Sequence, residues 1–189
     1  MREYENMAES YWKETTIPGL LVIERPTFRD ERGFFREAMR LDELEEAIGH
    51  PFLPLQWNHS YSKPRVIRAL HAENWNKLVY PVTGTMFAAL VDIRPERSTF
   101  GTVATLEFQE EYPQALFIPK GVANSICVKG NVPVHYLYLV DAYYDGSDTR
   151  AIAWDDPDLK ISWPVAEPVI SERDRNNPRL RELFPEKFS

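Results

Sequence analysis

The sequence predicts an all-β protein with the antiparallel strands of a jelly roll, and three observations indicate this. Short apolar or alternating segments recur along most of the 189 residues, and Pro or Gly residues separate them. Hydrophobic residues make up 43% of the chain and aromatic residues 13%, enough for one domain with a full core. Clear helical patterns are confined to one short segment and the tail. We therefore expect a single domain over residues 1–189, a sandwich or barrel with a few short peripheral helices.

The first third of the chain predicts a leader, a hairpin and a helix. Residues 1–16 are polar and acidic, so we expect a loosely ordered segment without the apolar core of a signal peptide. The letters D-E-R-G at 30–33 predict a turn between two short strands. Leu41 to Ile48 has a helical pattern, with Asp42 as its expected cap and Gly49 as its end.

The remaining strands are expected at regular intervals. Leu53 to Ser62 alternates, and its polar residues, which include Gln56 and Asn58, share a face that suits the lining of a cavity. A Thr-Gly turn separates two further strands after Lys77. The later strands are expected at Thr102–Phe108, Ala115–Pro119, Ala123–Val128 and Val134–Val140. Only the tail returns to a helical pattern, which Pro178 divides.

The segment from Val66 to Lys77 combines a strand pattern with Arg68, His71 and Lys77. His71 could be an ordinary half-buried histidine, and Arg68 and Lys77 could be ordinary charges at a sheet edge. Side chains alternate along a strand, so Arg68 and His71, three positions apart, share a site only if a bulge, a strong twist or a long reach intervenes. Because a sheet core does not accept three such groups without a use, we place the chemistry here.

Composition narrows the class of partner. The formal net charge is −7, from 29 acidic and 22 basic residues, which argues against a nucleic-acid polymer but not against a small anionic ligand. No apolar run is long enough to span a membrane, so no membrane partner is expected. The single cysteine, Cys127, excludes an internal disulfide and fits a reducing cytoplasm.

Several chemistries lack their sequence patterns. The four histidines form no H-x-H pair, so no metal is expected, although a site assembled from distant residues stays open as a minor alternative. Cys127 lies in an apolar strand, and no G-x-S-x-G elbow is present. No glycine-rich dinucleotide or phosphate loop occurs, so no cofactor is expected.

Acid–base chemistry remains. His71 is the candidate base, Asp156 the carboxylate that would orient its ring, and Lys77 the cation for an oxyanion. Tyr138 is the candidate acid and shares a strand face with Tyr136, although composition alone favours an aromatic core stripe. A base, a facing acid and a cation together suit proton abstraction next to a carbonyl.

Ten segments, in order, resemble one family over nearly the whole chain, from about Ile17 to Leu183: R-D-E-R-G-F-F-R-E at 29–37, Q-W-N-H-S-Y-S at 56–62, V-I-R-A-L-H at 66–71, K-L-V at 77–79, V-D-I-R-P at 91–95, T-F-G at 99–101, F-I-P-K-G-V-A-N at 117–124, D-A-Y-Y at 141–144, A-W-D-D-P-D-L at 153–159 and I-S-W-P at 161–164. The family is the dTDP-4-dehydrorhamnose 3,5-epimerases, metal-free enzymes with a cupin-like jelly-roll fold. The resemblance implies an isomerase without a cofactor, acting on a dTDP-4-keto-6-deoxy sugar, most directly dTDP-4-dehydro-6-deoxyglucose.

The resemblance also assigns residues. The family's base matches His71, its dyad carboxylate Asp156, its opposite-face tyrosine Tyr138 and its lysine Lys77. Gln56, Asn58 and Arg68 match contacts to the sugar and the diphosphate, and Tyr144 matches an aromatic residue of the nucleotide region. The family forms a strand-exchanged homodimer, and its residues that reach the neighbouring subunit's nucleotide match Arg32, Phe35 and Glu37.

Three departures from the family pattern leave the substrate open. Ala69 replaces a glycine, the loop before the lysine is shortened to A-E-N-W-N, and Asn124 replaces a histidine. Asn124 can still hydrogen-bond to sugar or phosphate but cannot titrate. The alternatives are an enzyme that inverts one centre or uses another nucleotide or a heptose, and a sugar-binding module without turnover.

Overall fold

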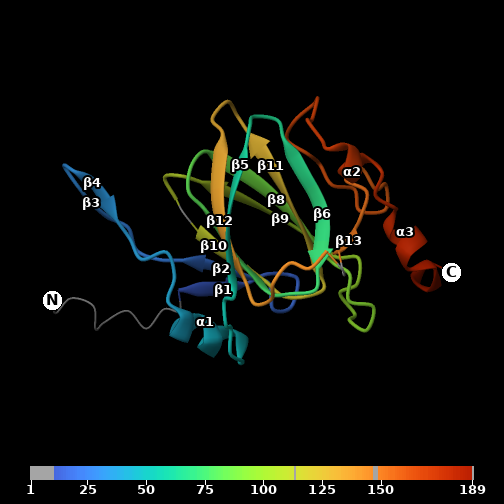
Figure 1. The fold of residues 1–189 in the computed structure, drawn as a ribbon, viewed down its shortest axis with the longest axis horizontal. Coiled ribbons are helices and arrows are strands. Elements are labelled where there is room, and N and C mark those ends of the chain that lie inside the picture. Colours follow the sequence, from blue (N-terminus) through green and yellow to red (C-terminus); the bar gives the residue numbers. More distant parts are fainter. Residues whose placement is uncertain (1–10, 113, 147–148, 189) are drawn as a thin grey trace.

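The computed structural model describes residues 11–112, 114–146 and 149–188. Within them, two antiparallel sheets face one another, and a hairpin and short helices lie around them (Figure 1). From β5 to β8, and again from β9 to β13, successive strands cross between the two sheets. This alternation confirms the predicted all-β class and is typical of a jelly roll.

The six-stranded sheet contains, in spatial order, β1 (Trp12–Glu14), β2 (Leu21–Glu24), β10 (Gln114–Ile118), β7 (Lys77–Pro81), β12 (Val134–Val140) and β5 (Gln56–Ser62). The five-stranded sheet contains β13 (Thr149–Ala151), β6 (Ile67–Glu73), β11 (Val122–Lys129), β8 (Thr85–Asp92) and β9 (Val103–Gln109). The hairpin consists of β3 (Phe28–Asp30) and β4 (Gly33–Phe35), and it projects away from both sheets (Figure 1).

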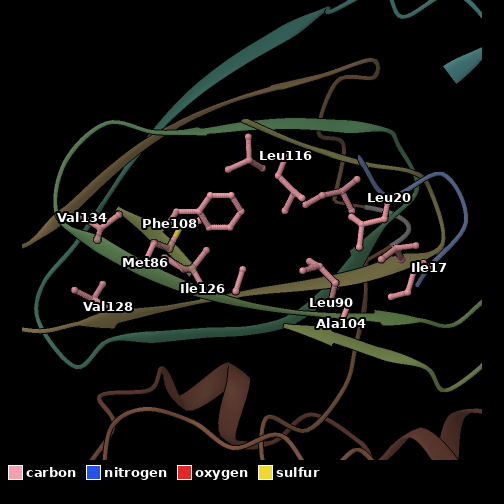
Figure 2. Close-up of a cluster of buried hydrophobic side chains, with 14 residues drawn as sticks. Ile17, Leu20, Met86, Leu90, Ala104, Phe108, Leu116, Ile126, Val128 and Val134 are labelled. Atoms are coloured by element: carbon pink, nitrogen blue, oxygen red, sulfur yellow. The ribbon is translucent and has the colours of Figure 1, made fainter. Parts of the chain in front are cut away.

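The main core fills the space between the sheets (Figure 2). Apolar side chains from both layers meet there, including Met86, Leu90, Phe108, Leu116 and Val134. Burial of apolar surface contributes roughly 25 cal/mol per Å², so the burial of these side chains between the sheets stabilises the fold. The polar residues Gln56 and Asn58 of β5 and His71 and Glu73 of β6 lie outside this cluster and line a cavity.

The helices cover the outer faces of the two sheets. Helix α1 (Leu41–Ile48) packs Leu44 against the six-stranded sheet. The C-terminal segment packs Ile152, Leu159 and Leu180 against the five-stranded sheet and carries α2 (Glu172–Arg175), α3 (Leu180–Leu183) and a final 3-10 turn (Pro185–Lys187). The predicted division of the tail at Pro178 is confirmed, since Pro178 lies between α2 and α3.

Two local expectations differ from the structure. Trp12–Glu14, in the segment expected to be loosely ordered, pairs with β2 as a strand, while residues 1–10 lie outside the described residues. Asp42 does not cap α1, because Arg40 holds the cap position and Asp42 instead accepts a hydrogen bond from the Glu43 amide. Gly49 does end the helix, with a left-handed φ of 77° that glycine adopts without strain.

Strand β6 contains a bulge that changes which side chains share a face. Its pairing with β11 joins Asn124 to His71 and Ile126 to Arg68, so three steps on β6 match two on β11. Ala69 and Leu70 are consequently both buried, and both pack in the cluster that includes the C-terminal segment. Arg68 is exposed and His71 is partly exposed. The bulge removes the conflict that strict alternation raised for Arg68 and His71.

Candidate active site

A cavity of about 270 Å³ opens between the polar ends of the two sheets. Its lining combines titratable, amide and aromatic side chains: Gln56, Asn58, His71, Glu73, Trp75, Tyr138, Tyr144 and Arg173. Five of the twelve residues that the sequence singled out line it, from β5, β6, β12 and the loop after β12. A concave site with convergent polar groups is the ordinary form of a small-molecule site.

His71 is oriented by a carboxylate from the C-terminal segment. His71 Nε2 lies 2.8 Å from Asp174 Oδ1, and the Ala69 amide donates to Asp174 Oδ2 at 3.4 Å. Burial raises the pKa of Asp174, but the hydrogen bond and charge of His71 outweigh it and leave that pKa below its ordinary value. With Nε2–H directed at the carboxylate, Nδ1 is the basic nitrogen of the neutral imidazole.

The expected dyad between His71 and Asp156 is wrong in the structure. Asp156 is buried, and its two oxygens accept hydrogen bonds from the Leu180 amide at 2.6 Å and the Asp158 amide at 2.9 Å. Asp156 therefore ties the loop 153–159 to the start of α3. The carboxylate that contacts His71 is Asp174, which lies 103 residues further along the chain.

Lys77 lies at the start of β7, where its side chain is only 9% exposed. Its ammonium donates to Glu73 Oε2 at 3.0 Å and to Asn124 Oδ1 at 3.3 Å. Asn124 Nδ2 in turn donates to the backbone oxygen of His71 at 2.7 Å. The amide thus links the lysine to the strand that carries His71.

Tyr138 lies on β12, in the same sheet as Lys77 and opposite the sheet that carries His71 and Asn124. Its ring centroid lies 5.2 Å from the Lys77 ammonium, and it stacks on Tyr136 at 5.7 Å between centroids. Burial raises the pKa of Tyr138 to about 12, so the phenol carries its proton at neutral pH. Tyr138 thus stacks on Tyr136 and also presents a protonated phenol to the cavity.

Amide side chains from β5 form one wall. Gln56 Nε2 donates to Asn58 Oδ1 at 2.8 Å, and Gln56 Oε1 accepts from the Tyr144 amide at 3.0 Å. Within the described part of the chain, Asn58 Nδ2 and Trp75 Nε1 are buried donors without a partner. Unpaired buried donors are costly, so oxygen atoms of a ligand would stabilise this wall.

Arg68 and the hairpin residues occupy other positions. Arg68 reaches back to β5, where it donates to Ser62 Oγ at 3.0 Å and to the Tyr61 backbone oxygen at 3.2 Å. Arg32 is held by Asp30 at 2.5 Å on the exposed hairpin turn, Phe35 is 67% exposed, and Glu37 pairs with Arg25 and Arg40. Within one chain none of these hairpin residues lines the cavity.

Four residues of the site are not among those that the sequence predicts: Glu73, Trp75 and Arg173, which line the cavity, and Asp174, which contacts His71. Glu73 lies two positions after His71, so strand alternation could have placed it on the same face. Trp75 lies in the short loop already noted for its length. For Asp174 the sequence offers only a weak signal, the position of Ser171 as a possible N-cap before a short polar segment.

Residues 11–112, 114–146 and 149–188 lack two features. No group of three or more His, Cys, Asp or Glu side chains there could hold a metal ion. No helix there is long and apolar enough to cross a membrane.

Comparison with known proteins places this geometry in a family. Residues 14–182 match the family model described as dTDP-4-dehydrorhamnose 3,5-epimerase. The chain is 36% identical over 171 residues to the Shigella flexneri protein of that name, covering 88% of this chain and 94% of the relative.

Two solved structures are also similar. One is the Legionella pneumophila dTDP-6-deoxy-D-glucose-3,5-epimerase in complex with dTDP-4-keto-L-rhamnose, with a TM-score of 0.85, 32% identity and coverage of 93% of this chain and 95% of the other. The second is ChmJ, a 3'-monoepimerase from Streptomyces bikiniensis in complex with dTDP-quinovose, with a TM-score of 0.84, 27% identity and coverage of 90% and 89%. With a jelly-roll fold, a histidine–carboxylate pair and this similarity along nearly its whole length, the chain belongs to the dTDP-4-dehydrorhamnose 3,5-epimerase family.

Proposed function

We propose that the protein epimerises dTDP-4-dehydro-6-deoxyglucose at carbons 3 and 5 and yields dTDP-4-dehydrorhamnose. The observation that carries this is one cavity lined by His71 from the five-stranded sheet and Tyr138 from the six-stranded sheet. Asp174 of α2 orients His71, and the Lys77 ammonium lies 5.2 Å from the centroid of the Tyr138 ring. A 4-keto group makes the hydrogens on both neighbouring carbons acidic. The substrate therefore supplies its own electron sink, and no cofactor is required.

Each inversion begins with removal of a proton. His71 Nδ1 takes the proton from the carbon next to the keto group, and the C–H electrons move to the keto oxygen as an enolate. Lys77 stabilises the negative charge on that oxygen, and Asp174 stabilises the imidazolium. The negative enolate and the positive imidazolium formed in this step thus meet Lys77 and Asp174, which are already in place.

Inversion then requires a proton on the opposite face of the same carbon. Tyr138 carries one, since burial raises its pKa to about 12. The phenol protonates the carbon as the enolate electrons return. The His71 imidazolium then releases its proton to solvent, and the transient phenolate takes one up, which restores both groups for the next inversion. Gln56, Asn58 and Tyr144 would hold the sugar, diphosphate and nucleotide, with the unpaired Asn58 and Trp75 donors available to ligand oxygens.

The protein is proposed to act as a homodimer whose hairpin reaches the partner's nucleotide. The support is the β3–β4 hairpin, which projects away from the sheets of its own chain (Figure 1), and whose Phe34 and Phe35 are 52% and 67% exposed. Arg32 on this hairpin would contact the partner's diphosphate. Arg32→Ala should then weaken dTDP binding by about ten-fold or more, because a charge-assisted contact contributes ~1.5–3 kcal/mol. A fully active monomer contradicts this arrangement.

The test of function is incubation of the pure protein with dTDP-4-dehydro-6-deoxyglucose in heavy water. Proton NMR should show deuterium at carbons 3 and 5 and conversion to the rhamnose configuration. Binding without deuterium uptake would instead indicate a sugar-binding module.

A strong chelator should leave the rate of epimerisation unchanged, and a loss of rate reversed by one divalent ion would refute the metal-free mechanism. The lone cysteine, Cys127, agrees with a proposed location in the reducing cytoplasm.

A second candidate is inversion at one centre only. It is favoured by the similarity to the 3'-monoepimerase and by the local differences at Asn124 and the short β6–β7 loop. The same NMR experiment separates the two, because a monoepimerase inverts one centre. Deuterium at both carbons with inversion at both would exclude it.

A further inference from the structure

Glu73 is a cavity residue to which neither the sequence nor the reaction scheme gives a role. It ends β6, two positions after His71, and its side chain is 16% exposed. Glu73 Oε2 lies 3.0 Å from the Lys77 ammonium across the β6–β7 turn. The short turn, Asn74 to Asn76, is what brings these two charged groups together.

The ammonium of Lys77 is fixed from two sides. Its partners are Glu73 Oε2 at 3.0 Å and Asn124 Oδ1 at 3.3 Å, and Asn124 Nδ2 also lies 3.5 Å from Glu73 Oε2. A lysine ammonium has three N–H donors. The two acceptors that the described residues provide leave one donor for the substrate, in a direction set by the other two.

The charge balance of the cavity depends on Glu73. Burial raises the pKa of Glu73, but the charge and hydrogen bond of Lys77 outweigh it and leave that pKa below its ordinary value. An ammonium as buried as Lys77 requires a counter-charge, because desolvation otherwise favours the neutral amine. Asp174 is engaged by His71, so Glu73 supplies the carboxylate for Lys77.

We propose that Glu73 is a positioning residue that keeps Lys77 charged and directs its remaining N–H at the keto oxygen of the substrate. The role rests on the proposed epimerase function, in which that oxygen becomes negative. Glu73 acts through Lys77 and takes no proton from the sugar. A neutral amine, or an ammonium free to rotate, would stabilise the enolate less well.

The test compares Glu73→Gln, which keeps the shape and removes the charge, with Glu73→Asp, which keeps the charge. Glu107→Gln is the matched control, because Glu107 pairs with Lys129 at 2.7 Å outside the cavity, where both side chains are exposed. For each variant, kcat and KM are measured as functions of pH, with dTDP affinity by calorimetry. Circular dichroism verifies that each variant is folded.

Glu73→Gln should lower kcat by about 10- to 100-fold while KM and dTDP affinity change by less than about three-fold. The alkaline limb of its kcat profile should move to lower pH, because the ammonium form loses its counter-charge. Glu73→Asp should recover most of the lost rate, and Glu107→Gln should match the parent. An unchanged kcat, or a loss without movement of the pH profile, would overturn the proposal.

A second measurement needs no substrate. Trace acetylation with acetic anhydride labels only neutral amines, and peptide mass spectrometry compares Lys77 with Lys129 in the same sample. Glu73→Gln should raise the relative labelling of Lys77 several-fold near pH 8. If the parent shows no turnover but this labelling rises, the epimerase function fails and the effect of Glu73 on Lys77 stands. Unchanged labelling overturns the role of Glu73 whatever the enzyme does.

Discussion

The loop 153–159 and helix α2 both pack at the five-stranded sheet, and each contributes an aspartate that is 4% exposed. Asp156, in the loop, accepts hydrogen bonds from the amides of Leu180 and Asp158. Asp174, in the helix, faces the ring of His71 and the amide of Ala69. The two carboxylates have the same burial and differ in the chemistry of their partners.

This difference separates a structural carboxylate from a functional one. A backbone amide does not gain or lose a proton, so the contacts of Asp156 with amides hold α3 against the loop and take no part in proton transfer. In the proposed mechanism the imidazole of His71 gains a proton, so Asp174 would stabilise the charged form that the reaction creates. Burial by itself therefore does not identify a catalytic carboxylate; the partner's ability to change charge does.

The largest expected effect comes from Asp174→Asn. The variant keeps the shape but loses the charge that stabilises the imidazolium, so kcat should fall by ~10²–10⁴-fold. Deuterium uptake at carbons 3 and 5 should fall in the same proportion, since both steps need the base. Affinity for dTDP, measured by calorimetry, should change by less than about three-fold. If kcat is retained, the distinction between the two aspartates fails.

Tyr138→Phe sharpens the comparison from the other face of the sugar. It should slow net inversion by about 10²-fold, the lower range for loss of a general acid, while leaving the base and its carboxylate intact. His71 can then remove a proton and return deuterium to the same face, so exchange should outlast inversion. NMR in heavy water measures both rates in one sample. Equal losses would mean that Tyr138 orients the substrate and that another group is the acid.

Asp156→Asn should affect stability and leave catalysis nearly unchanged. One backbone amide would then face an amide donor in place of an acceptor, which costs about 1–3 kcal/mol of the free energy of unfolding. Urea titration followed by tryptophan fluorescence measures this loss. The kcat per folded molecule should stay within about two-fold of the parent. A loss comparable with that of Asp174→Asn would restore Asp156 as a catalytic group.

The smallest effect is in the acid dependence of stability. The pKa of Asp174 is depressed in the folded protein, so its contribution is present above the unfolded value of about 3.9 and is lost as pH falls through the folded value. The stability difference between the parent and Asp174→Asn should therefore be constant near pH 5 and narrow below about pH 4. Urea midpoints at pH 5 and pH 3 test this. A difference that widens at pH 3 has the wrong sign.

Local patterns in the sequence determined much of the fold. Strand β12 and helix α1 lie at the predicted positions, Val134–Val140 and Leu41–Ile48. Period-two alternation also placed Gln56 and Asn58 on one face, and both line the cavity. These features depend on neighbours within a few residues, so the sequence carries them directly.

The tertiary structure alone decided which groups became partners. Asp156 and Asp174 are both aspartates in polar tail segments, and no local pattern distinguishes which one reaches a histidine more than 80 residues earlier. The bulge in β6 was offered only as one possibility, because it depends on pairing with β11. Partner choice is set by how the C-terminal segment packs on the sheet, and that packing follows from the summed burial of residues such as Ile152, Leu159 and Leu180, which no single segment encodes.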